Sequence, residues 1–148
     1  MSPALPEFDR SLPMMLLRAR EAAMARFRPV LTDAEVTEQQ WRVVRALADV
    51  AEATPSELAE RCAILPPSMT RIVRTLVDRG FATRRSDRND LRRTLLSITP
   101  AGRELVSAMS PQITAIYDEF NRRLGEPGLD ELLERLDVLI AEPSGSRD

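Results

Sequence analysis

The chain has 148 residues and a net charge of −2, and 43% of its residues are apolar although only 4% are aromatic. That length predicts one compact domain, whose core has to be built mainly from aliphatic side chains. The chain has no histidine and one cysteine, which excludes within a single chain a Ser-His-Asp triad, a Cys-His pair, a zinc site with imidazole ligands and an internal disulfide. We therefore expect no enzyme activity, no metal site and no cofactor.

The sequence contains no candidate for a membrane-spanning segment. No window approaches the roughly 18 unbroken apolar residues of such a helix. The N-terminal "MSPALPEFDRSLPMMLL" carries acidic residues where a signal peptide has a basic region. Together with the single cysteine, these features predict a cytoplasmic protein with no membrane partner.

Prolines and apolar spacing define the N-terminal region. The prolines of the first thirteen residues predict an extended arm: Pro3, Pro6 and Pro13. Apolar side chains at helical spacing then predict a helix over 14–31. Pro29 is expected to bend that helix or to end it.

Two capping boxes predict where the next two helices begin. Thr37 is expected to cap a second helix with Gln40 at its third position. Thr54, followed by Pro55 and Glu57, predicts a short helix that ends near Cys62.

A fourth helix is predicted over 67–79, with Gly80 as its left-handed end. Its apolar residues share one face and are expected in the core: Met69, Ile72, Val73 and Leu76. After it, "FATRRS" and "TLLSI" predict a two-stranded antiparallel ribbon joined by the loop "DRNDLRR".

Two helices are predicted to complete the chain. Thr99-Pro100 starts a long helix that runs to about Leu124, with a kink at Pro111. Apolar spacing predicts the last helix from Leu129 to Ile140, and residues 143–148 are predicted to be a disordered tail.

Positive charge is concentrated in one part of the chain. Residues 61–93 hold nine arginines and three aspartates, a net charge of +6, so the remainder carries −8. An arginine-rich block in an acidic chain predicts a local surface for a polyanion. A solvated loop tip with balanced charges is the alternative interpretation of residues 87–92.

The order of these elements is typical of a winged helix-turn-helix, in which a short helix, a tight break and a second helix are followed by a basic ribbon. The fold class we expect is mainly α, with a small two- to three-stranded antiparallel wing. Such a protein places the second helix in the DNA major groove, and an arginine of the wing can enter the neighbouring minor groove. Asp87 and Asp90 are expected to hold arginine guanidiniums by paired hydrogen bonds.

The segment "DRNDLRRTLLSITPAG" resembles the wing of the MarR family of bacterial transcriptional regulators, and "PPSMTRIVRTLVDRGFATR" resembles its recognition helix. "VTEQQWRVVRALA" and "CAILPPSMTRI" are similar to the subgroup that regulates homoprotocatechuate (4-hydroxyphenylacetate) degradation operons. Asn89 departs from the family pattern, where many members have arginine. Pro66 stands where members often have a serine cap, so the helix start is expected to shift toward Ser68.

We expect ten residues to serve DNA binding. Ser68, Thr70 and Arg71 are expected at base edges, and Pro67 against a thymine methyl group. Phosphate contacts are expected from Arg74, Arg84 and Arg85, with Arg88 at the basic loop tip. Arg92 is the residue expected in the minor groove, and Asp90 is expected to position it.

The apolar stripes at 14–27, 113–124 and 129–140 exceed what a small winged helix needs, and they predict a homodimer. Packing within one chain is the alternative. The expected domains are an arm and dimerisation helix (1–33), the DNA-binding domain (34–99) and the C-terminal dimerisation helices (100–142). A dimer would read a pseudo-palindromic operator in double-stranded DNA with its recognition helices about 34 Å apart.

The family resemblance implies a repressor released by a small aromatic carboxylate that binds near the dimerisation helices. Residues in the matching segments are Arg18, Arg20, Met24, Phe27 and Trp41. An arginine suits the carboxylate, and the apolar residues could line an aromatic slot. The alternative is that these apolar residues belong to the core and that Arg18 or Arg20 pairs with Glu21 or a partner chain.

Two other functions remain open from the sequence. One is a winged-helix protein–protein adaptor that binds no DNA. The other is a redox-sensing repressor, which would need Cys62 as an exposed thiolate of lowered pKa. We expect Cys62 to be a buried structural residue.

Overall fold

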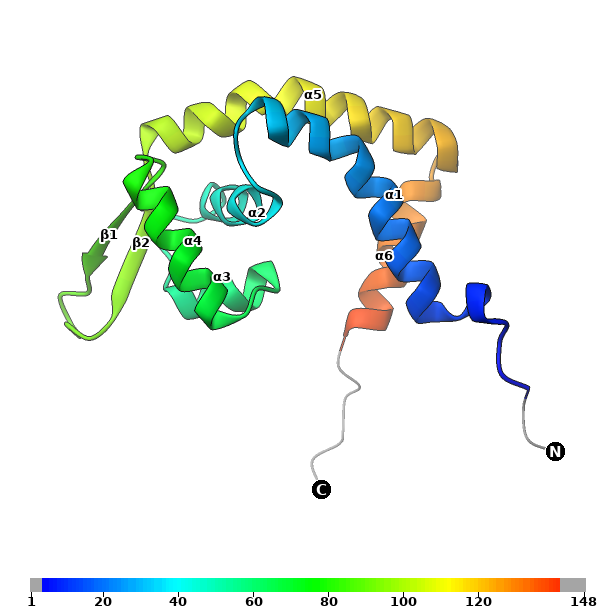
Figure 1. Cartoon of the computed structure of the whole chain (residues 1–148), viewed down its shortest axis with the longest axis horizontal. Coiled ribbons are helices and arrows are strands. Elements are labelled where there is room, and N and C mark those ends of the chain that lie inside the picture. Colours follow the sequence, from blue (N-terminus) through cyan, green and yellow to red (C-terminus); the bar gives the residue numbers. More distant parts are fainter. Residues whose placement is uncertain (1–3, 142–148) are drawn as a thin grey trace. The chain divides into compact units, whose positions relative to one another are not determined.

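The structure is a computed structural model that describes residues 4–141 (Figure 1). The chain divides into two compact units, Met1–Pro111 and Gln112–Asp148, and the boundary falls within one long helix. The tail predicted at 143–148 lies outside the described residues.

The N-terminal region is more helical than predicted. A 3-10 turn, η1 (Phe8–Arg10), precedes helix α1 (Leu12–Asp33), so residues 8–13 do not form an extended arm. Pro13 lies in the first turn of α1, where the absence of an N–H group breaks no helical hydrogen bond. Pro29 lies inside α1 and does not end it, because the hydrogen-bond ladder resumes beyond it, with Ala34 N–H donating to the Val30 carbonyl at 3.1 Å.

Both predicted capping boxes are confirmed. Helix α2 (Glu38–Leu47) begins after Thr37, whose hydroxyl accepts from the Gln40 N–H at 3.1 Å while the Gln40 side chain accepts from the Thr37 N–H at 3.1 Å. Helix α3 (Pro55–Cys62) begins in the same way, with Thr54 and Glu57 exchanging bonds of 3.2 and 3.0 Å. These two boxes fix where both helices begin.

Helix α4 (Pro66–Asp78) starts at Pro66, so the expected shift toward Ser68 is wrong. Leu65 occupies the cap position without a side-chain hydrogen bond, and proline fits the first turn without one. The turn from α3 to α4 passes through Ala63 in the left-handed region (φ 52°). As predicted, Gly80 (φ 80°) ends the helix in a conformation that favours glycine.

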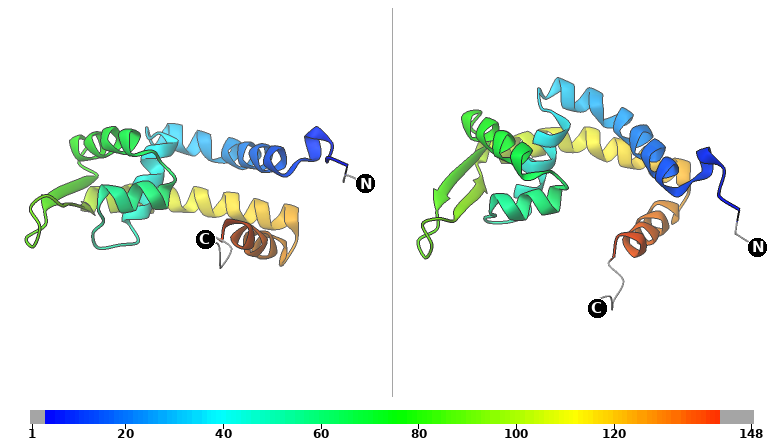
Figure 2. Two further views of the ribbon diagram at one scale, coloured as in Figure 1. Left: turned by 90° about the horizontal axis from the view of Figure 1, so that it is seen from below. Right: turned by 60° about the horizontal axis from the view of Figure 1, so that its bottom comes forward.

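The wing is a two-stranded antiparallel sheet of β1 (Ala82–Ser86) and β2 (Thr94–Ile98), with Ala82 opposite Ile98. Ala53, in the segment between α2 and α3, adds a single bridge to β2. It exchanges two backbone hydrogen bonds of 3.0 and 2.8 Å with Leu96. The ribbon tip projects beyond the helices α3 and α4 (Figures 1 and 2).

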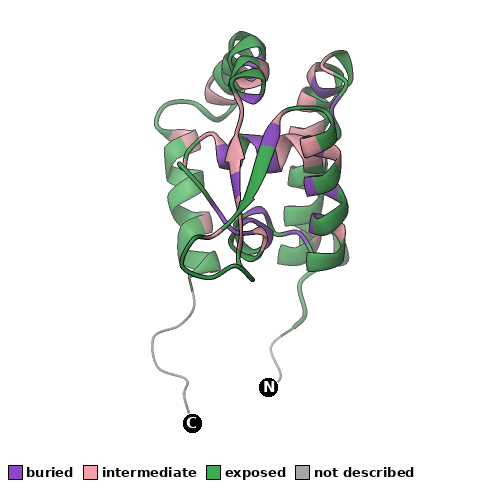
Figure 3. Cartoon of the chain, turned by 90° about the vertical axis from the view of Figure 1, so that its left-hand side faces the viewer, coloured by how far each residue is buried: buried purple, intermediate pink, exposed green. Residues whose placement is uncertain are grey.

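One apolar core holds α2, α3, α4 and the ribbon together (Figure 3). Burying these aliphatic side chains is the main favourable contribution to folding of this unit. The four α4 residues predicted as core are confirmed as buried. The largest fully buried side chains are Leu47, Leu58, Met69, Leu76, Leu96, Val43 and Val44.

Helix α5 (Pro100–Leu124) is continuous through Pro111. In the second unit, Gly125 (φ 72°) turns the chain into α6 (Gly128–Ile140). The Tyr117 and Phe120 rings meet edge to face at 5.9 Å. No helix within residues 4–141 is long and apolar enough to cross a membrane.

Candidate nucleic-acid interface

Helix α4 has one buried face and one exposed, positively charged face. Met69, Ile72, Val73 and Leu76 point into the core, and Arg71 and Arg74 are exposed. Residues 63–77 contain no acidic side chain. The exposed face therefore attracts anions, and it belongs to the helix that follows the tight α3–α4 turn.

The smaller residues predicted at base edges lie at the start of the same helix. Pro67 and Thr70 are exposed, and Ser68 is half-buried. The Thr70 hydroxyl donates to the Pro66 carbonyl at 3.2 Å, which leaves its oxygen free to accept a further hydrogen bond. This end of α4 can present both an apolar and a hydrogen-bonding surface.

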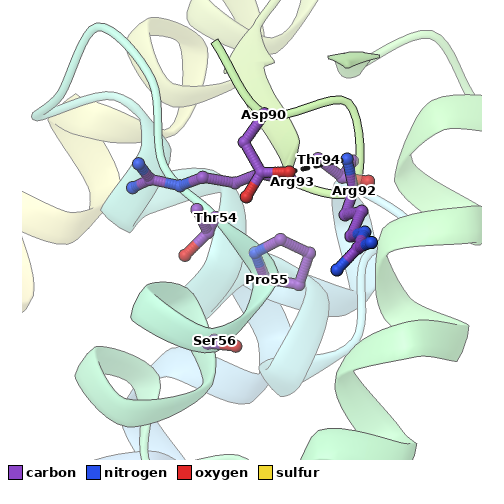
Figure 4. Close-up of a pocket in the computed structure, with 7 residues that line it drawn as sticks. All are labelled: Thr54, Pro55, Ser56, Asp90, Arg92, Arg93 and Thr94. Atoms are coloured by element: carbon purple, nitrogen blue, oxygen red, sulfur yellow. Dashed lines mark hydrogen bonds between the residues drawn. The ribbon is translucent and has the colours of Figure 1, made fainter. Parts of the chain in front are cut away.

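The wing loop is shaped by two aspartates through its backbone. Asp87 Oδ1 accepts from the Asn89 N–H at 3.0 Å. Asp90 Oδ1 accepts from the Arg92 N–H at 3.1 Å (Figure 4). The expectation that both aspartates hold guanidiniums by paired hydrogen bonds is therefore wrong, because their carboxylates form turns with N–H groups two residues on. A looser ion pair remains between Asp87 Oδ2 and Arg93 Nη1 at 3.8 Å.

The arginines of this surface fall into two groups. Arg85 pairs with Glu52, and Arg93 pairs with Glu57 at 3.2 Å. Within residues 4–141, five exposed arginines of the predicted set have no hydrogen bond or ion pair through the guanidinium: Arg71, Arg74, Arg84, Arg88 and Arg92. The unpaired group can meet an external anion without first breaking an internal contact.

A shallow cleft of about 450 Å³ lies between the wing and the start of α3 (Figure 4). Arg92 and Arg93 line it from the wing, and Thr54, Pro55 and Ser56 line it from α3. Beside this cleft, the ion pair between Arg93 and Glu57 links the wing to α3.

The residues predicted to bind an effector lie on α1 and α2, two helices in contact with each other. Arg18 is exposed, while Met24, Phe27 and Trp41 are half-buried. Arg20 forms an ion pair with Glu38, and Glu38 also accepts from Arg42 at 2.9 Å.

Cys62 is buried, with 3% of its surface exposed, and its thiol donates to the Arg42 carbonyl at 3.7 Å. Burial raises the pKa of this thiol, against the opposing charges of Arg42 and Arg61. A redox sensor needs the reverse, an exposed thiolate of lowered pKa, so the structure contradicts that alternative.

The sequence did not identify the acidic partners of the wing. Glu52 and Glu57 contact arginines 33 and 36 positions away, a separation at which no local pattern exists. Arg79 is a similar case, since it donates to the Glu35 carbonyl at 2.7 Å and lies over the Phe81 ring at 4.9 Å. Two other pairs have the four-residue spacing that the sequence can indicate: Glu38 with Arg42 at 2.9 Å and Arg45 with Asp49 at 2.6 Å.

A short helix, a tight turn, an exposed basic helix and a projecting basic ribbon together define a winged helix-turn-helix protein. Residues 34–93 match the model of the MarR family. The transcriptional regulator FarR of Neisseria gonorrhoeae is 37% identical over 132 residues, which cover 89% of this chain and 88% of FarR. The homoprotocatechuate degradative operon repressor of Escherichia coli is 37% identical over 131 residues, which cover 88% of each protein.

A solved structure extends the similarity to the fold. The crystal structure of NadR in complex with 4-hydroxyphenylacetate matches with a TM-score of 0.80 at 34% identity, covering 93% of this chain and 97% of NadR. This chain belongs to the MarR family of DNA-binding transcriptional regulators. Its relatives are regulators of transcription and not enzymes, in agreement with the expectation from its composition.

Proposed function

We propose that this chain is a homodimeric repressor, acting in the cytoplasm, that binds a pseudo-palindromic operator and leaves it when a small aromatic carboxylate binds. The observation that carries the DNA-binding part is the row of unpaired, exposed arginines on α4 and the wing. Guanidiniums without an internal acceptor keep their donors for phosphates and base edges.

Each element of this surface has its own task in the proposal. Ser68, Thr70 and Arg71 read base edges in the major groove, and Pro67 meets a thymine methyl group. Arg74, Arg84 and Arg88 neutralise phosphates, and Arg92 enters the minor groove from a loop whose turn is set by Asp90.

The dimer is supported by apolar side chains that the chain leaves exposed. On α1 they are Leu12, Met15, Leu16 and Leu17, and on α6 they are Leu132, Leu133, Val138, Leu139 and Ile140. A monomer rarely keeps so many large apolar side chains of a helix exposed to water, and the apolar face of a second copy is the occupant we propose for each helix. Light scattering of the purified protein should give twice the monomer mass of 16.6 kDa.

The effector part of the proposal is supported by the relatives. One is named as a repressor of homoprotocatechuate degradation, and NadR was solved with 4-hydroxyphenylacetate. In this chain, Arg20 is the cation that we propose for the carboxylate, with Met24, Phe27 and Trp41 around the ring. Because Arg20 pairs with Glu38, the effector carboxylate would replace Glu38 at the guanidinium.

The test is a titration of the protein onto duplexes enriched from a random library by rounds of binding. Fluorescence anisotropy should show an enriched duplex bound far more tightly than a scrambled duplex, and addition of 4-hydroxyphenylacetate should weaken that binding. Failure to enrich any duplex at moderate salt would contradict the repressor proposal and favour the protein–protein adaptor. Enrichment without an effect of aromatic carboxylates would contradict only the effector part.

A further inference from the structure

Arg85 is the most tightly held arginine of the wing. Its Nε and Nη2 donate to the two carboxylate oxygens of Glu52 at 2.8 Å each, and its Nη1 donates to the Ser86 carbonyl at 3.3 Å. The Glu52 hydrogen bond raises the pKa of Arg85 above its already high value. A guanidinium engaged on both edges has to break this paired contact before it can bind a phosphate.

Glu52 lies in the segment between α2 and α3, and Arg85 lies on β1, so their contact joins the wing to the helical part of the domain. The neighbouring residue Ala53 is bonded through its backbone to Leu96 on β2. The segment of Glu52 and Ala53 therefore touches both strands of the ribbon, by a side chain on β1 and by the backbone on β2.

A second contact of the same kind lies at the other end of the ribbon loop. Arg93 donates to Glu57 on α3 at 3.2 Å. The two anchored arginines thus flank the loop that carries Arg88 and Arg92, whose guanidiniums have no partner within residues 4–141. The anchored residues hold the wing where its strands meet the loop, and Arg88 and Arg92 lie in the loop between them.

Glu52 places a negative charge beside the proposed DNA-binding surface. A carboxylate beside a DNA-binding surface repels phosphates and by itself lowers the affinity for a duplex. Glu52 can therefore favour DNA binding only by holding Arg85, and with it the wing, in place.

From this arrangement we infer that Arg85 is a positioning residue and not a phosphate contact. Its pairing with Glu52 fixes the wing against the α2–α3 segment, so that Arg92 reaches the minor groove when α4 lies in the major groove. The inference rests on the proposed DNA binding and replaces the phosphate contact expected of Arg85 from the sequence.

The decisive variant is Glu52→Gln, with Glu60→Gln as its matched control. Both substitutions remove one negative charge, and the Glu60 carboxylate on α3 has no hydrogen bond or ion pair among residues 4–141. In anisotropy titrations with an enriched duplex, Glu52→Gln should bind about three- to fivefold more weakly than the wild type, the loss expected for one good exposed pair. Glu60→Gln should bind equally well or slightly more tightly. If Glu52→Gln binds as tightly as Glu60→Gln, the inference is wrong.

The salt dependence of binding tests Arg85 itself. Arg85→Gln should weaken binding about as much as Glu52→Gln does, and the double variant should be no weaker than either single variant, because one contact is lost in all three. The slope of log K against log salt should stay at the wild-type value. A slope that is flatter by about one in Arg85→Gln would show a released phosphate contact and overturn the inference.

Two further readouts separate this inference from the function on which it rests. In hydroxyl-radical footprints, Glu52→Gln should lose protection of the outer minor groove and keep protection around the major-groove contacts, which a general loss of stability would not produce. If the wild type binds no duplex, the proposed function fails. Even then, faster amide exchange in β1 of Glu52→Gln than of Glu60→Gln would support the anchoring itself, and equal exchange would overturn it.

Discussion

Asp90 holds Arg92 through the backbone: its Oδ1 accepts a hydrogen bond from the Arg92 N–H at 3.1 Å. The carbonyl of Asp90 accepts from the Arg93 N–H at 2.9 Å, and the Arg93 carbonyl accepts from the Asp87 N–H at 2.8 Å. This set of bonds closes the wing loop. Asp90 therefore fixes the position of the Arg92 backbone and forms no hydrogen bond with its guanidinium.

The role of Asp90 can be tested with two substitutions. Asp90→Asn keeps an oxygen that accepts from the Arg92 N–H and removes a negative charge, so operator binding should be unchanged or slightly tighter. Asp90→Ala removes the acceptor and should weaken binding by about 0.5–1 kcal/mol. Anisotropy titrations of both variants give the comparison. Equal weakening by both would show that the charge of the carboxylate matters, as the sequence had led us to expect.

Arg92 is predicted to contribute to binding and hardly to stability. Its side chain is exposed and unpaired among the described residues, so Arg92→Ala removes no hydrogen bond or ion pair of the guanidinium. Operator binding should weaken by about 1–3 kcal/mol. The melting temperature, measured by circular dichroism, should stay within about one degree of the wild type, since such surface substitutions change stability little. Wild-type affinity in this variant would contradict the assignment of the wing.

Arg74 is predicted to bind a phosphate and to contribute nothing to the choice between DNA sequences. Arg74→Ala should weaken binding to enriched and scrambled duplexes by similar factors, and it should flatten the salt dependence by about one. Titrations of both duplexes at several salt concentrations measure the two effects together. A loss confined to the enriched duplex would instead place Arg74 at a base edge.

Cys62 should make the free energy of unfolding decrease as the pH becomes alkaline. Burial raises the pKa of the folded thiol above its ordinary value of 9.0, so as pH rises the unfolded chain loses this proton first. The free energy of unfolding should therefore fall from about pH 9 upward, by at most about 1.4 kcal/mol per pH unit from this group.

The comparison for this effect is Cys62→Ala, which has no thiol to titrate. Urea unfolding at pH 7 to 10 should show a smaller fall for the variant than for the wild type, whatever the constant difference that the smaller side chain causes. Parallel curves would show that the thiol ionises as readily in the folded protein as in the unfolded chain.

Local signals in the sequence predicted the local parts of this structure. The capping boxes at Thr37 and Thr54 depend on residues three positions apart, and both form as expected. The buried face of α4 follows from its apolar spacing in the same way. Prolines were harder to interpret from the sequence. Pro13 and Pro66 fit the first turn of a helix, and Pro29 removes only one hydrogen bond from the long helix α1.

The contacts of the site depend on pairs that are far apart in the sequence. An arginine count identified the basic surface, but it could not divide the arginines into paired and unpaired ones. That division needs the fold to bring Glu52 beside Arg85 and Glu57 beside Arg93. The sequence also could not show that Asp87 and Asp90 accept hydrogen bonds from backbone N–H groups, since aspartates in a loop can equally pair with guanidiniums.

A hydroxyl-radical footprint on an enriched duplex tests most directly whether α4 and the wing form the DNA-binding surface. The wild type should protect two half-sites about one helical turn apart, with outer minor-groove protection that Arg92→Ala selectively removes. Protection that is unchanged in Arg92→Ala and in a variant with both Arg71 and Arg74 replaced by alanine would contradict that surface, as would a protein that protects no duplex.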